Sequence, residues 1–539
     1  MLSSCQIIGV ETVSIAQHIK GLVVPIRASG AARPRPALVL FLFLLAVFSI
    51  LLLLAFARAV DDWNWVAWSV LPLMAANAVW ISGGAATSIL GLLAQRGAVA
   101  GPPTAWRPHG KTAVLITLCG EEPEPVTRYL ESLCDGFGHI ALDKNTRIFV
   151  LSDTSGDASC AREDAAFADI VSSGRVSFRR RTMRIGKKPG NITDWLNAYG
   201  DAYDHMVVLD ADSRMSPASI RYLIWKMETN PGLGLCQAGI SLVPGRTRFG
   251  RYQRVTSRLL SRTFGNGFAA WSGKTGNYWG HNAIIRVAAF RACAELPRLS
   301  GSAPVGGAIL SHDFVEAAWI RRAGWSVELC PNLSGSAEDA PQTLEEFFKR
   351  DRRWCQGNLQ HLRLIAEPGL YGLSRFHLLS GIFSYLAAPI WLVLVALLSS
   401  DRISVWGFLP VLSIAVVLLI PKLCALIEAL PRATTRQRRR IILRAWRSEL
   451  ILSALLAPII MLRQATFVGA ILLGRDCGWK SPEGEGVRLP LGWPEAGLGL
   501  ALLALTVAQQ ATGAFWLALV ILPLMSAPFL LPKLNEVPR

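Results

Sequence analysis

The strongest constraint on this chain is the gathering of its apolar residues into long blocks. The first block runs from about Ala37 to Phe56, the second from about Trp63 to Leu93, and apolar composition resumes near Phe376. A helix needs roughly 20 consecutive apolar residues to cross a bilayer, and blocks of this length supply them. Hydrophobic residues make up 52% of the 539-residue chain and charged residues only 17%, unlike an ordinary globular domain. The sequence therefore predicts a membrane protein.

Six transmembrane helices are predicted, in three pairs that occupy residues 37–94, 376–425 and 495–532. The first block lies too late in the chain and is too long to be a secretory signal peptide. A further block, 450–473, is long enough to span a bilayer, but Arg463 and Gln464 lie near its middle, where one charge costs about 2.5–3.5 kcal/mol. We therefore interpret this block as an interfacial or re-entrant segment.

Basic residues predict the orientation of these helices. The amino-terminal arm, residues 1–36, carries four Lys and Arg residues, and the segment 431–449 carries seven arginines. Cytoplasmic loops are enriched in Lys and Arg, so the arm, both termini and the whole of residues 431–494 are expected in the cytoplasm. The net charge of +17 is interpreted as membrane topology, and no nucleic acid partner is expected.

Between the first two helix pairs the sequence predicts a soluble α/β domain, residues 110–345. Short apolar runs at 112–117, 147–152 and 206–209 are strand candidates, and residues 125–134 and 191–203 are helix candidates. Strands that alternate with helices indicate a mostly parallel sheet. The predicted fold class is therefore an α/β domain inserted into an α-helical transmembrane domain.

The third predicted strand ends in two carboxylates, Asp210 and Asp212. In open α/β sheets, ligands bind outside the carboxyl ends of the strands. Two carboxylates there can hold a hard divalent cation, which in turn neutralises a diphosphate. Asp is also a common turn residue, so the pair alone leaves a solvated turn as the alternative.

Charged groups also follow the other strand candidates, where the strand ends are expected to converge. The first strand runs into Glu121, which suits a nucleobase or a ribose, and the second ends in Asp153. The basic segment 184–191 contains Lys188 and precedes a helix candidate, and lysines at a helix amino terminus suit a phosphate. By itself, that segment favours a solvated basic loop over a phosphate site.

Two later segments combine aromatic, polar and acidic groups. Trp279, His281 and Asn282 lie together, and an aromatic ring can pack against a sugar face; a turn packed by a core tryptophan is the alternative. Asp313 lies at or just before a helix amino terminus. It could accept the proton of an attacking hydroxyl, or it could be a structural N-cap.

Residues 346–370 are predicted to form an interfacial helix just before the membrane. Arg350, Arg353 and Trp354 recur at i, i+3 and i+4 and therefore share one helix face. Together they could meet a pyrophosphate and a sugar ring. The alternative is an interfacial anchor without a role in chemistry.

The order of these motifs resembles the processive membrane glycosyltransferases of family 2, which include cellulose, chitin and hyaluronan synthases. Those enzymes show Asp, Asp-x-Asp, Thr-Glu-Asp and Gln-x-x-Arg-Trp motifs between membrane helices. This chain has Ser311-His312-Asp313 in place of Thr-Glu-Asp and Arg350 in place of the usual Gln. Both departures, with residues 278–286 and 350–358, are similar to the glucans biosynthesis glucosyltransferase H family, and the match covers about residues 110–365 in detail.

The resemblance implies a GT-A-type domain with a Rossmann-like mixed sheet, and it gives each candidate residue a role. On the donor, UDP-glucose, Glu121 and Asp153 would hold the uridine, and Lys188, Arg350 and Arg353 would meet the phosphates. Asp210 would approach the donor, and Asp212 would bind Mg²⁺ or Mn²⁺. Asp313 would be the general base, Trp354 the floor of the acceptor site, and Trp279, His281 and Asn282 the lining of the acceptor path.

The function implied by the resemblance is inverting, processive transfer of glucose from UDP-glucose to a growing glucan acceptor. The product would be the β-1,2-linked glucose backbone of osmoregulated periplasmic glucans. Whether the same chain exports this product stays open. The implied location is the bacterial inner membrane with a cytoplasmic catalytic domain. Implied partners are the lipid bilayer, acyl carrier protein and periplasmic glucan proteins. Residues 475–488 match the gating loop of cellulose synthase in position only.

Two alternatives remain at the level of the sequence. The chain could be another family 2 polysaccharide synthase, similar to a cellulose or hyaluronan synthase. It could instead be a membrane receptor or transporter with a nucleotide-binding domain. Charged residues within the predicted spans are few, which disfavours an ion-coupled transporter.

Overall fold

The structure is a computed structural model that describes residues 36–94, 101–293, 296–399, 409–477, 491–509 and 516–538. Residues 1–35, nearly all of the predicted amino-terminal arm, lie outside the described residues. Residues 478–490, most of the predicted gating loop, lie outside them as well. The predictions for these two segments therefore have no structural outcome.

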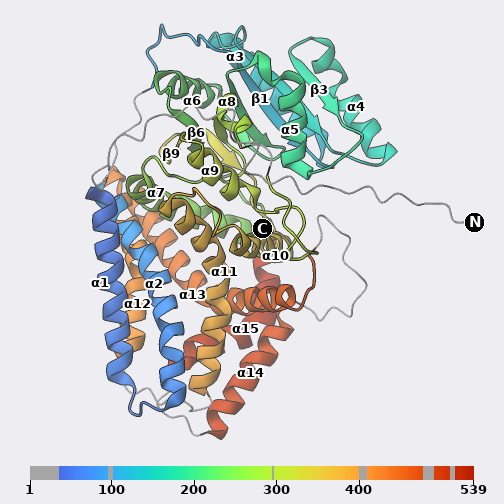
Figure 1. The fold of residues 1–539 in the computed structure, drawn as a ribbon. Coiled ribbons are helices and arrows are strands. Elements are labelled where there is room, and N and C mark those ends of the chain that lie inside the picture. Colours follow the sequence, from blue (N-terminus) through green and yellow to red (C-terminus); the bar gives the residue numbers. More distant parts are fainter. Residues whose placement is uncertain are drawn as a thin grey trace, which may run out of the picture. The chain divides into compact units, whose positions relative to one another are not determined.

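A seven-stranded sheet forms the centre of the α/β domain (Figure 1). Its strand order is β3-β2-β1-β4-β8-β6-β9, in which β8 pairs antiparallel with β4 and β6 and the other pairs are parallel. The strands are β1 (Thr112–Leu118), β2 (Thr146–Ser152), β3 (Val176–Arg180), β4 (His205–Asp210), β6 (Leu233–Ala238), β8 (Ala283–Arg286) and β9 (Ser326–Cys330). The three strands predicted from the sequence, at 112–117, 147–152 and 206–209, are confirmed, as is the mixed α/β fold class.

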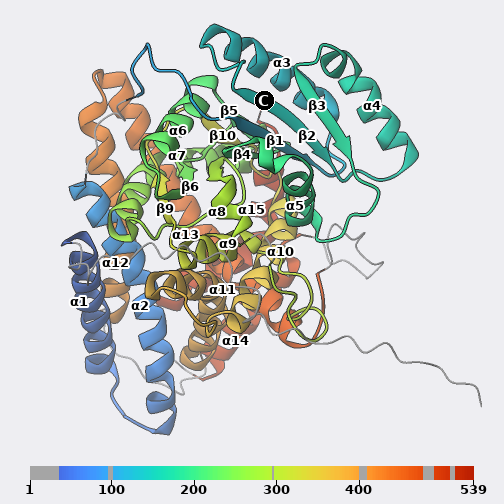
Figure 2. The same ribbon diagram turned by 45° about the horizontal axis from the view of Figure 1, so that its top comes forward.

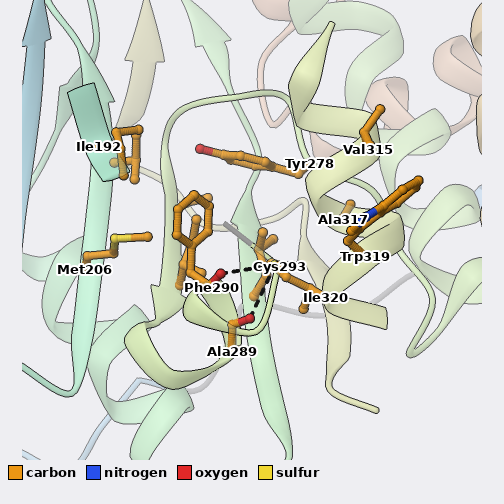
Figure 3. Packing of buried hydrophobic residues seen from close by; sticks show 14 of the residues in the cluster. Ile192, Met206, Tyr278, Ala289, Phe290, Cys293, Val315, Ala317, Trp319 and Ile320 are labelled. Carbon is orange, nitrogen blue, oxygen red and sulfur yellow. Dashed lines mark hydrogen bonds between the residues drawn. The ribbon is translucent and has the colours of Figure 1, made fainter. Parts of the chain in front are cut away.

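Helices cover both faces of this sheet (Figure 2). Successive residues of a strand point to opposite faces, so Val114 and Ile116 of β1 pack on one side and Ala113 and Leu115 on the other. The first side is covered by α3 (Pro123–His139), α4 (Asp157–Ser172) and α6 (Pro217–Thr229). The second is covered by α5 (Lys187–Tyr199), α8 (Val287–Arg291) and α9 (His312–Arg322), and Figure 3 shows Tyr278 enclosed in this layer. The carboxyl edge of the sheet is left for a site.

A second, three-stranded sheet follows the Asp-x-Asp motif. Its order is β5 (Arg214–Met215), β10 (Ser336–Glu338) and β7 (Ser241–Leu242). Because β5 begins two residues after Asp212, its pairing with β10 brings Glu338 back to the Asp-x-Asp motif. This contact joins segments more than a hundred residues apart.

Six helices among the described residues are long and apolar enough to cross a membrane. They are α1 (Pro36–Ala59), α2 (Trp65–Leu93), α11 (Gly372–Ser399), α12 (Leu409–Ala429), α13 (Arg436–Leu472) and α15 (Ala518–Asn535). The count agrees with the predicted six, but the set differs. Helix α14 (Trp493–Ala508), expected as a span, is shorter than the others, and α13 takes its place in the set.

The segment 431–473 differs from its prediction. A basic loop followed by a separate segment was expected, whereas α13 is one continuous helix of 37 residues whose amino terminus is capped by Thr435. Most of the arginines predicted in a loop therefore lie in its first turns. A re-entrant segment must turn back on itself, so that form is wrong; the choice between an interfacial and a spanning helix stays open.

Helices α7 (Arg248–Ser272) and α10 (Leu344–Gln360) join the α/β domain to the apolar helices. Helix α7 packs closely on α2, where a Cβ on Gly267 would lie 1.8 Å from the carbonyl oxygen of Thr87. The end of α15 caps α10, because the Leu344 N–H donates to Asn535 Oδ1 at 2.9 Å. The amide of Asn535 also donates to Glu345 Oε2 at 2.7 Å. The predicted Arg-x-x-Arg-Trp helix is α10, and its amino terminus is thus held by α15, one of the six long apolar helices.

Candidate functional site

The carboxyl edge of the sheet gathers the predicted acidic residues. Glu121 follows β1, Asp153 follows β2, and Asp210 is the last residue of β4. Since the sheet order is β2-β1-β4 and these strands are parallel, the three segments end side by side. The Gly120 N–H donates to Thr154 Oγ1 at 2.8 Å and ties two of them together. The expected convergence of the strand ends is confirmed.

Lys188 forms an ion pair with Asp210. Its ammonium also donates to the carbonyl oxygen of Gly280 at 2.7 Å, and Thr117 Oγ1 donates to Asp210 Oδ1 at 3.0 Å. Burial alone would raise the pKa of the Asp210 carboxyl, but Lys188 and His281 outweigh it and lower this pKa. The sequence placed Lys188 in a loop, whereas α5 begins at Lys187 and includes it. Asp210 is therefore an ionised carboxylate in a fixed position.

Asp212 has the opposite electrostatic environment. Burial, Asp210 and Glu338 together raise the pKa of its carboxyl to about 6. The excess of carboxylates around Asp212 is what a divalent cation would neutralise, so this donor set fits Mg²⁺ or Mn²⁺. Among the described residues, no three His, Cys, Asp or Glu side chains are grouped closely enough to hold a metal alone. The set therefore suits a cation that is shared with a diphosphate.

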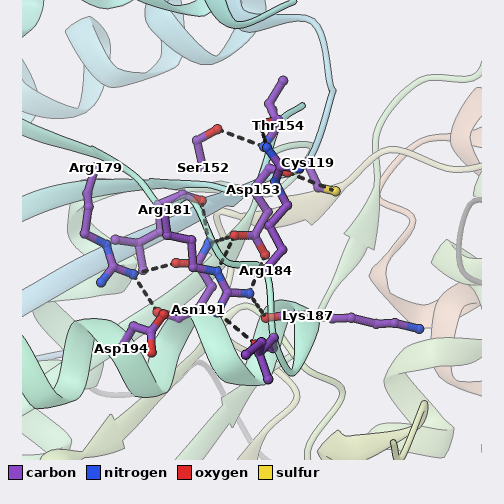
Figure 4. Close-up of polar contacts among 12 residues, drawn as sticks. Cys119, Ser152, Asp153, Thr154, Arg179, Arg181, Arg184, Lys187, Asn191 and Asp194 are labelled. Carbon is purple, nitrogen blue, oxygen red and sulfur yellow. Dashed lines mark hydrogen bonds and ion pairs between the residues drawn. The ribbon is translucent and has the colours of Figure 1, made fainter. Parts of the chain in front are cut away.

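Asp153 is part of a buried ion pair with Arg181 (Figure 4). The guanidinium donates from Nε to Asp153 Oδ1 at 2.6 Å and from Nη2 to Oδ2 at 2.7 Å. The same Nη2 donates to the Lys187 carbonyl oxygen at 2.7 Å, and Asn191 Nδ2 donates to Asp153 Oδ1 at 3.0 Å. Asp153 therefore fixes the basic segment at the start of α5, while Figure 4 shows the Lys187 side chain directed away from this cluster.

The segment 278–282 is held by Gln237 of β6. Its amide oxygen accepts the Trp279 N–H at 3.0 Å, and its amide nitrogen donates to the carbonyl oxygen of His281 at 3.0 Å. The His281 ring lies between Ser213 Oγ at 3.1 Å and Glu338 Oε2 at 3.1 Å. His281 therefore lies beside the Asp-x-Asp motif, on the donor side.

Asn282 is a correction to the predicted acceptor path. Its side chain is fully buried, and its Nδ2 donates to Ser336 Oγ at 2.9 Å and to the Ala337 carbonyl oxygen at 3.2 Å. A side chain enclosed in this way joins two segments and cannot line a path for an acceptor. Trp279, in contrast, is 39% exposed and remains available to a ligand.

Asp313 lies in the first turn of α9, whose N-cap is Ser311. The structural alternative, in which Asp313 itself is the N-cap, is therefore wrong. Burial raises the pKa of its carboxyl, Glu316 adds to that effect, and His312 and Lys188 oppose it. A Cβ on Gly280 would lie 3.7 Å from Asp313 Oδ2 and 3.9 Å from Lys188 Nζ. Gly280 thus separates the predicted base from the donor-side cation.

Helix α10 fixes the turn before Asp313. Gln360 Oε1 accepts the Leu310 N–H at 2.9 Å, and the His361 ring lies 3.0 Å from the Ser311 carbonyl oxygen. A Cβ on Gly357 would lie 2.3 Å from Ser311 Oγ, so only glycine permits this approach. The conformation of Ser311-His-Asp therefore depends on α10.

The predicted face of α10 is formed as expected. The Arg350 guanidinium lies over the Trp354 ring at 4.5 Å from its centroid, and this ring is 46% exposed. Burial lowers the pKa of Arg350, against the attraction of Glu338 and Asp212. Arg350 therefore stacks on Trp354 and is attracted by Glu338 and Asp212, and Arg353 acts electrostatically on Lys187.

Several residues that organise the site were missed from the sequence. They are Thr117, Arg181, Gln237, Glu338 and Gln360. Arg181 directly follows β3 and ends a run of three arginines, which was a usable signal. Nothing local marks the two glutamines or Glu338, because their partners lie far away in the chain.

Comparison with known proteins places this geometry in a family. A model described as glycosyl transferase family 2 matches residues 113–293, and one described as glycosyl transferase family group 2 matches residues 205–421. The chain contains a family 2 glycosyltransferase domain. The glycosyltransferase domain includes β1, β2, β4 and the Asp-x-Asp motif within the matched residues.

Curated relatives of the chain are named glucans biosynthesis glucosyltransferase H, and the predicted resemblance to that family is confirmed. The relative from Vibrio cholerae is 38% identical over 458 residues, which cover 79% of this chain and 63% of the relative. That from Xanthomonas campestris is 37% identical over 419 residues, covering 72% of this chain and 64% of the relative. The chain therefore spans less than two thirds of the length of these relatives.

Among solved structures, the domain is similar to a mannosyltransferase from Pyrobaculum calidifontis in complex with GDP-Man and Mn²⁺. The TM-score is 0.41 at 13% identity, covering 75% of this chain and 98% of that one. It is also similar to S. aureus TarS in complex with UDP-GlcNAc, with a TM-score of 0.32 at 10% identity, covering 70% of this chain and 100% of that one. Likenesses this weak carry no conclusion about ligands.

Proposed function

We propose that this protein transfers glucose from UDP-glucose to a growing glucan at a membrane, with inversion at the anomeric carbon. The single observation that carries the proposal is the arrangement around Gly280. Its carbonyl oxygen accepts from Lys188, the cation paired with Asp210, and its other neighbour is the Asp313 carboxylate. A donor phosphate site and a candidate base therefore border one residue, as an attack on a nucleotide sugar requires.

On the donor side, Lys188, Arg350 and Arg353 are proposed to meet the diphosphate of UDP-glucose. Asp212 is proposed to hold Mg²⁺ or Mn²⁺, with Asp210 as a donor contact. When bound, the cation neutralises negative charge that develops on the departing diphosphate. Glu121 is proposed to contact the uridine, whereas Asp153 acts on the uridine pocket through Arg181 and the basic segment. Fixed cationic groups supply the largest catalytic contribution in such a site.

On the acceptor side, Asp313 is proposed to be the general base and Trp354 the floor for the acceptor sugar. Asp313 accepts the proton of an acceptor hydroxyl as that oxygen attacks the anomeric carbon. The bond between this carbon and the diphosphate oxygen breaks, and UDP leaves. Because attack occurs opposite the leaving group, an α-linked donor gives a β-linked product, which we propose to be the β-1,2-linked glucan backbone.

The raised pKa of Asp313 supports its proposed role. A carboxylate at its ordinary pKa is a weak base, and burial strengthens it. Helix α10 packs against the turn before Asp313 at Gly357 and accepts a hydrogen bond from this turn at Gln360. The same helix carries Trp354. The proposed base and the proposed acceptor floor are therefore positioned by the same helix, α10.

We propose a location in the bacterial inner membrane, with the catalytic domain and both termini in the cytoplasm. The end of α15 contacts α10 through Asn535, which supports a carboxyl terminus on the side of the domain. The arginines at the start of α13 support the same side. A carboxyl-terminal tag that is accessible only from the periplasm would contradict this orientation. Acyl carrier protein and periplasmic glucan proteins remain proposed partners by family resemblance.

The decisive experiment combines the purified full chain with UDP-glucose and Mg²⁺, followed by UDP release and linkage analysis of the product. We expect UDP release together with a β-1,2-linked glucan. A product with another linkage would favour a cellulose- or hyaluronan-like synthase. Absence of UDP release, with intact UDP binding, would favour a receptor or transporter.

A further inference from the structure

A cavity of about 380 Å³ lies at the amino-terminal edge of the sheet, where β1 and β2 begin. Lys111, Thr146 and Arg147 line it, whereas Asp153 and Asp210 follow or end strands at the opposite edge. A strand of this length rises by about 20 Å at roughly 3.3 Å per residue. The cavity is therefore separate from the proposed donor site.

The rim of this cavity is positively charged. Four of its lining residues are cations, namely Lys111, Lys144, Arg147 and Arg175, and Asp143 is the one acid among its lining residues. Arg175 forms an ion pair with Asp135 at 2.7 Å, in which both side chains are largely exposed. Within the described ranges, neither lysine ammonium forms an ion pair with a carboxylate. The rim thus holds more positive than negative charge around an open cavity.

The floor of the cavity is apolar except for one unpartnered hydroxyl. Phe137 and Ile148 are buried and supply the apolar surface. Thr146 is only 8% exposed, and its Oγ1 has no hydrogen-bond partner among the described residues. The neighbouring Thr112, in register with Thr146 on β1, also has a buried hydroxyl without a partner. Because these hydroxyls are themselves enclosed by the protein, the floor offers a ligand mainly apolar contact.

We propose that this cavity is a second binding site, for a small molecule that carries a phosphate. Lysine and arginine side chains form charge-assisted hydrogen bonds with phosphate oxygens. The volume falls within the range of about 300–1,000 Å³ that is typical of ligand sites and exceeds the need of inorganic phosphate alone. The rest of the ligand, a carbon skeleton, lies on the apolar floor beside Phe137 and Ile148.

The test uses pyridoxal 5′-phosphate as the probe on the full-length protein. Its aldehyde condenses with a lysine amine to an imine with loss of water, and borohydride reduces this imine to a secondary amine that mass spectrometry locates. We expect pyridoxal 5′-phosphate to label Lys144 or Lys111 about tenfold faster than pyridoxal, which lacks the phosphate, labels them. A hydrogen bond to a charged group contributes enough binding free energy for this factor. Excess pyrophosphate should suppress this labelling.

Two controls separate the cavity from the donor site and from general surface charge. Saturation with UDP should protect Lys187 and Lys188 but leave the labelling of Lys144 unchanged. Arg147→Gln should abolish the preference for the phosphorylated probe, whereas Arg128→Gln, an exposed arginine outside the lining, should preserve it. Equal labelling by both probes, or protection of Lys144 by UDP, would overturn the proposal.

Discussion

The two halves of the proposed site differ in how their charges are compensated. In the donor half, at the ends of β2 and β4, Asp153 is paired with Arg181 and Asp210 with Lys188. In the acceptor half, Asp313 at the start of α9 has a raised pKa, and the Trp354 ring in the second half of α10 is half exposed. The difference indicates that ion pairs hold the donor carboxylates in place before a ligand arrives, whereas the acceptor half combines a carboxyl whose pKa is raised by burial with a half-exposed aromatic ring.

Asp212 is the exception within the donor half. Its carboxyl has a pKa raised to about 6 because burial, Asp210 and Glu338 all disfavour the charge. A group left uncompensated beside compensated neighbours is where a cation from solution would bind. The contrast between the two halves therefore predicts distinct effects of substitution in each.

The largest effect is expected from Asp313→Asn. The amide keeps the shape of the side chain but cannot accept the proton, so transfer should fall by about 10³-fold or more, the scale of a lost general base. UDP release from UDP-glucose in the presence of acceptor measures the rate, and UDP binding should be nearly unchanged. Near-normal turnover in this variant would remove Asp313 from the role of base.

Asp212→Asn should have the next largest effect, and it should act on the metal. We expect a loss of about 10²-fold in transfer and a large increase in the Mg²⁺ concentration for half-maximal rate, since one charged ligand is removed. Asp210→Asn is the matched comparison, because Asp210 is already neutralised by Lys188. If both variants showed the same metal dependence, the proposed division between the two carboxylates would fail.

The pH dependence of the metal requirement sharpens the same contrast. The pKa of Asp212 is raised from 3.8 to about 6, so the carboxyl holds a proton at pH values where an ordinary aspartate is charged. Protons then compete with the cation, and below about pH 6 the Mg²⁺ requirement should rise by about tenfold per pH unit. In Glu338→Gln one source of repulsion is lost, so this rise should begin at a lower pH. An unchanged onset would show that Glu338 does not act on Asp212.

The fold and the donor half were largely predictable from the sequence, because their signals are local. The strand that ends in Asp210 and Asp212 is an apolar run, and Lys188 lies just before a helical pattern. The helix face of Arg350 and Trp354 follows from their spacing alone. For such elements, periodicity and neighbouring residues determine the local structure.

The supporting contacts were not predictable, because they join distant segments. Gln237 holds the segment of Trp279, and Gln360 holds the turn before Asp313, yet each is an ordinary polar residue in a strand or a helix. Asn282 was assigned to the acceptor path from its position beside aromatic residues, but tertiary packing buries it. The segment 450–473 was interpreted as interfacial or re-entrant because Arg463 and Gln464 lie near its middle, whereas in the continuous helix α13 Arg463 is paired with Glu495 of α14.

The smallest effect is expected from Trp354→Leu, and it should be confined to the acceptor half. The ring is 46% exposed and stacks with Arg350, so its loss removes a platform for a sugar without opening a cavity in the core. An aromatic contact of this kind contributes about 0.5–1.5 kcal/mol beyond its area, which corresponds to about a twofold to tenfold rise in the KM for the acceptor. The KM for UDP-glucose should rise less than that for the acceptor, since Arg353 and Lys188 are untouched and only Arg350 loses its contact with the ring. Trp225→Leu, on α6 away from the site, is the matched control. A rise in the KM for UDP-glucose alone would place Trp354 in the donor half and contradict the proposed difference between the two halves.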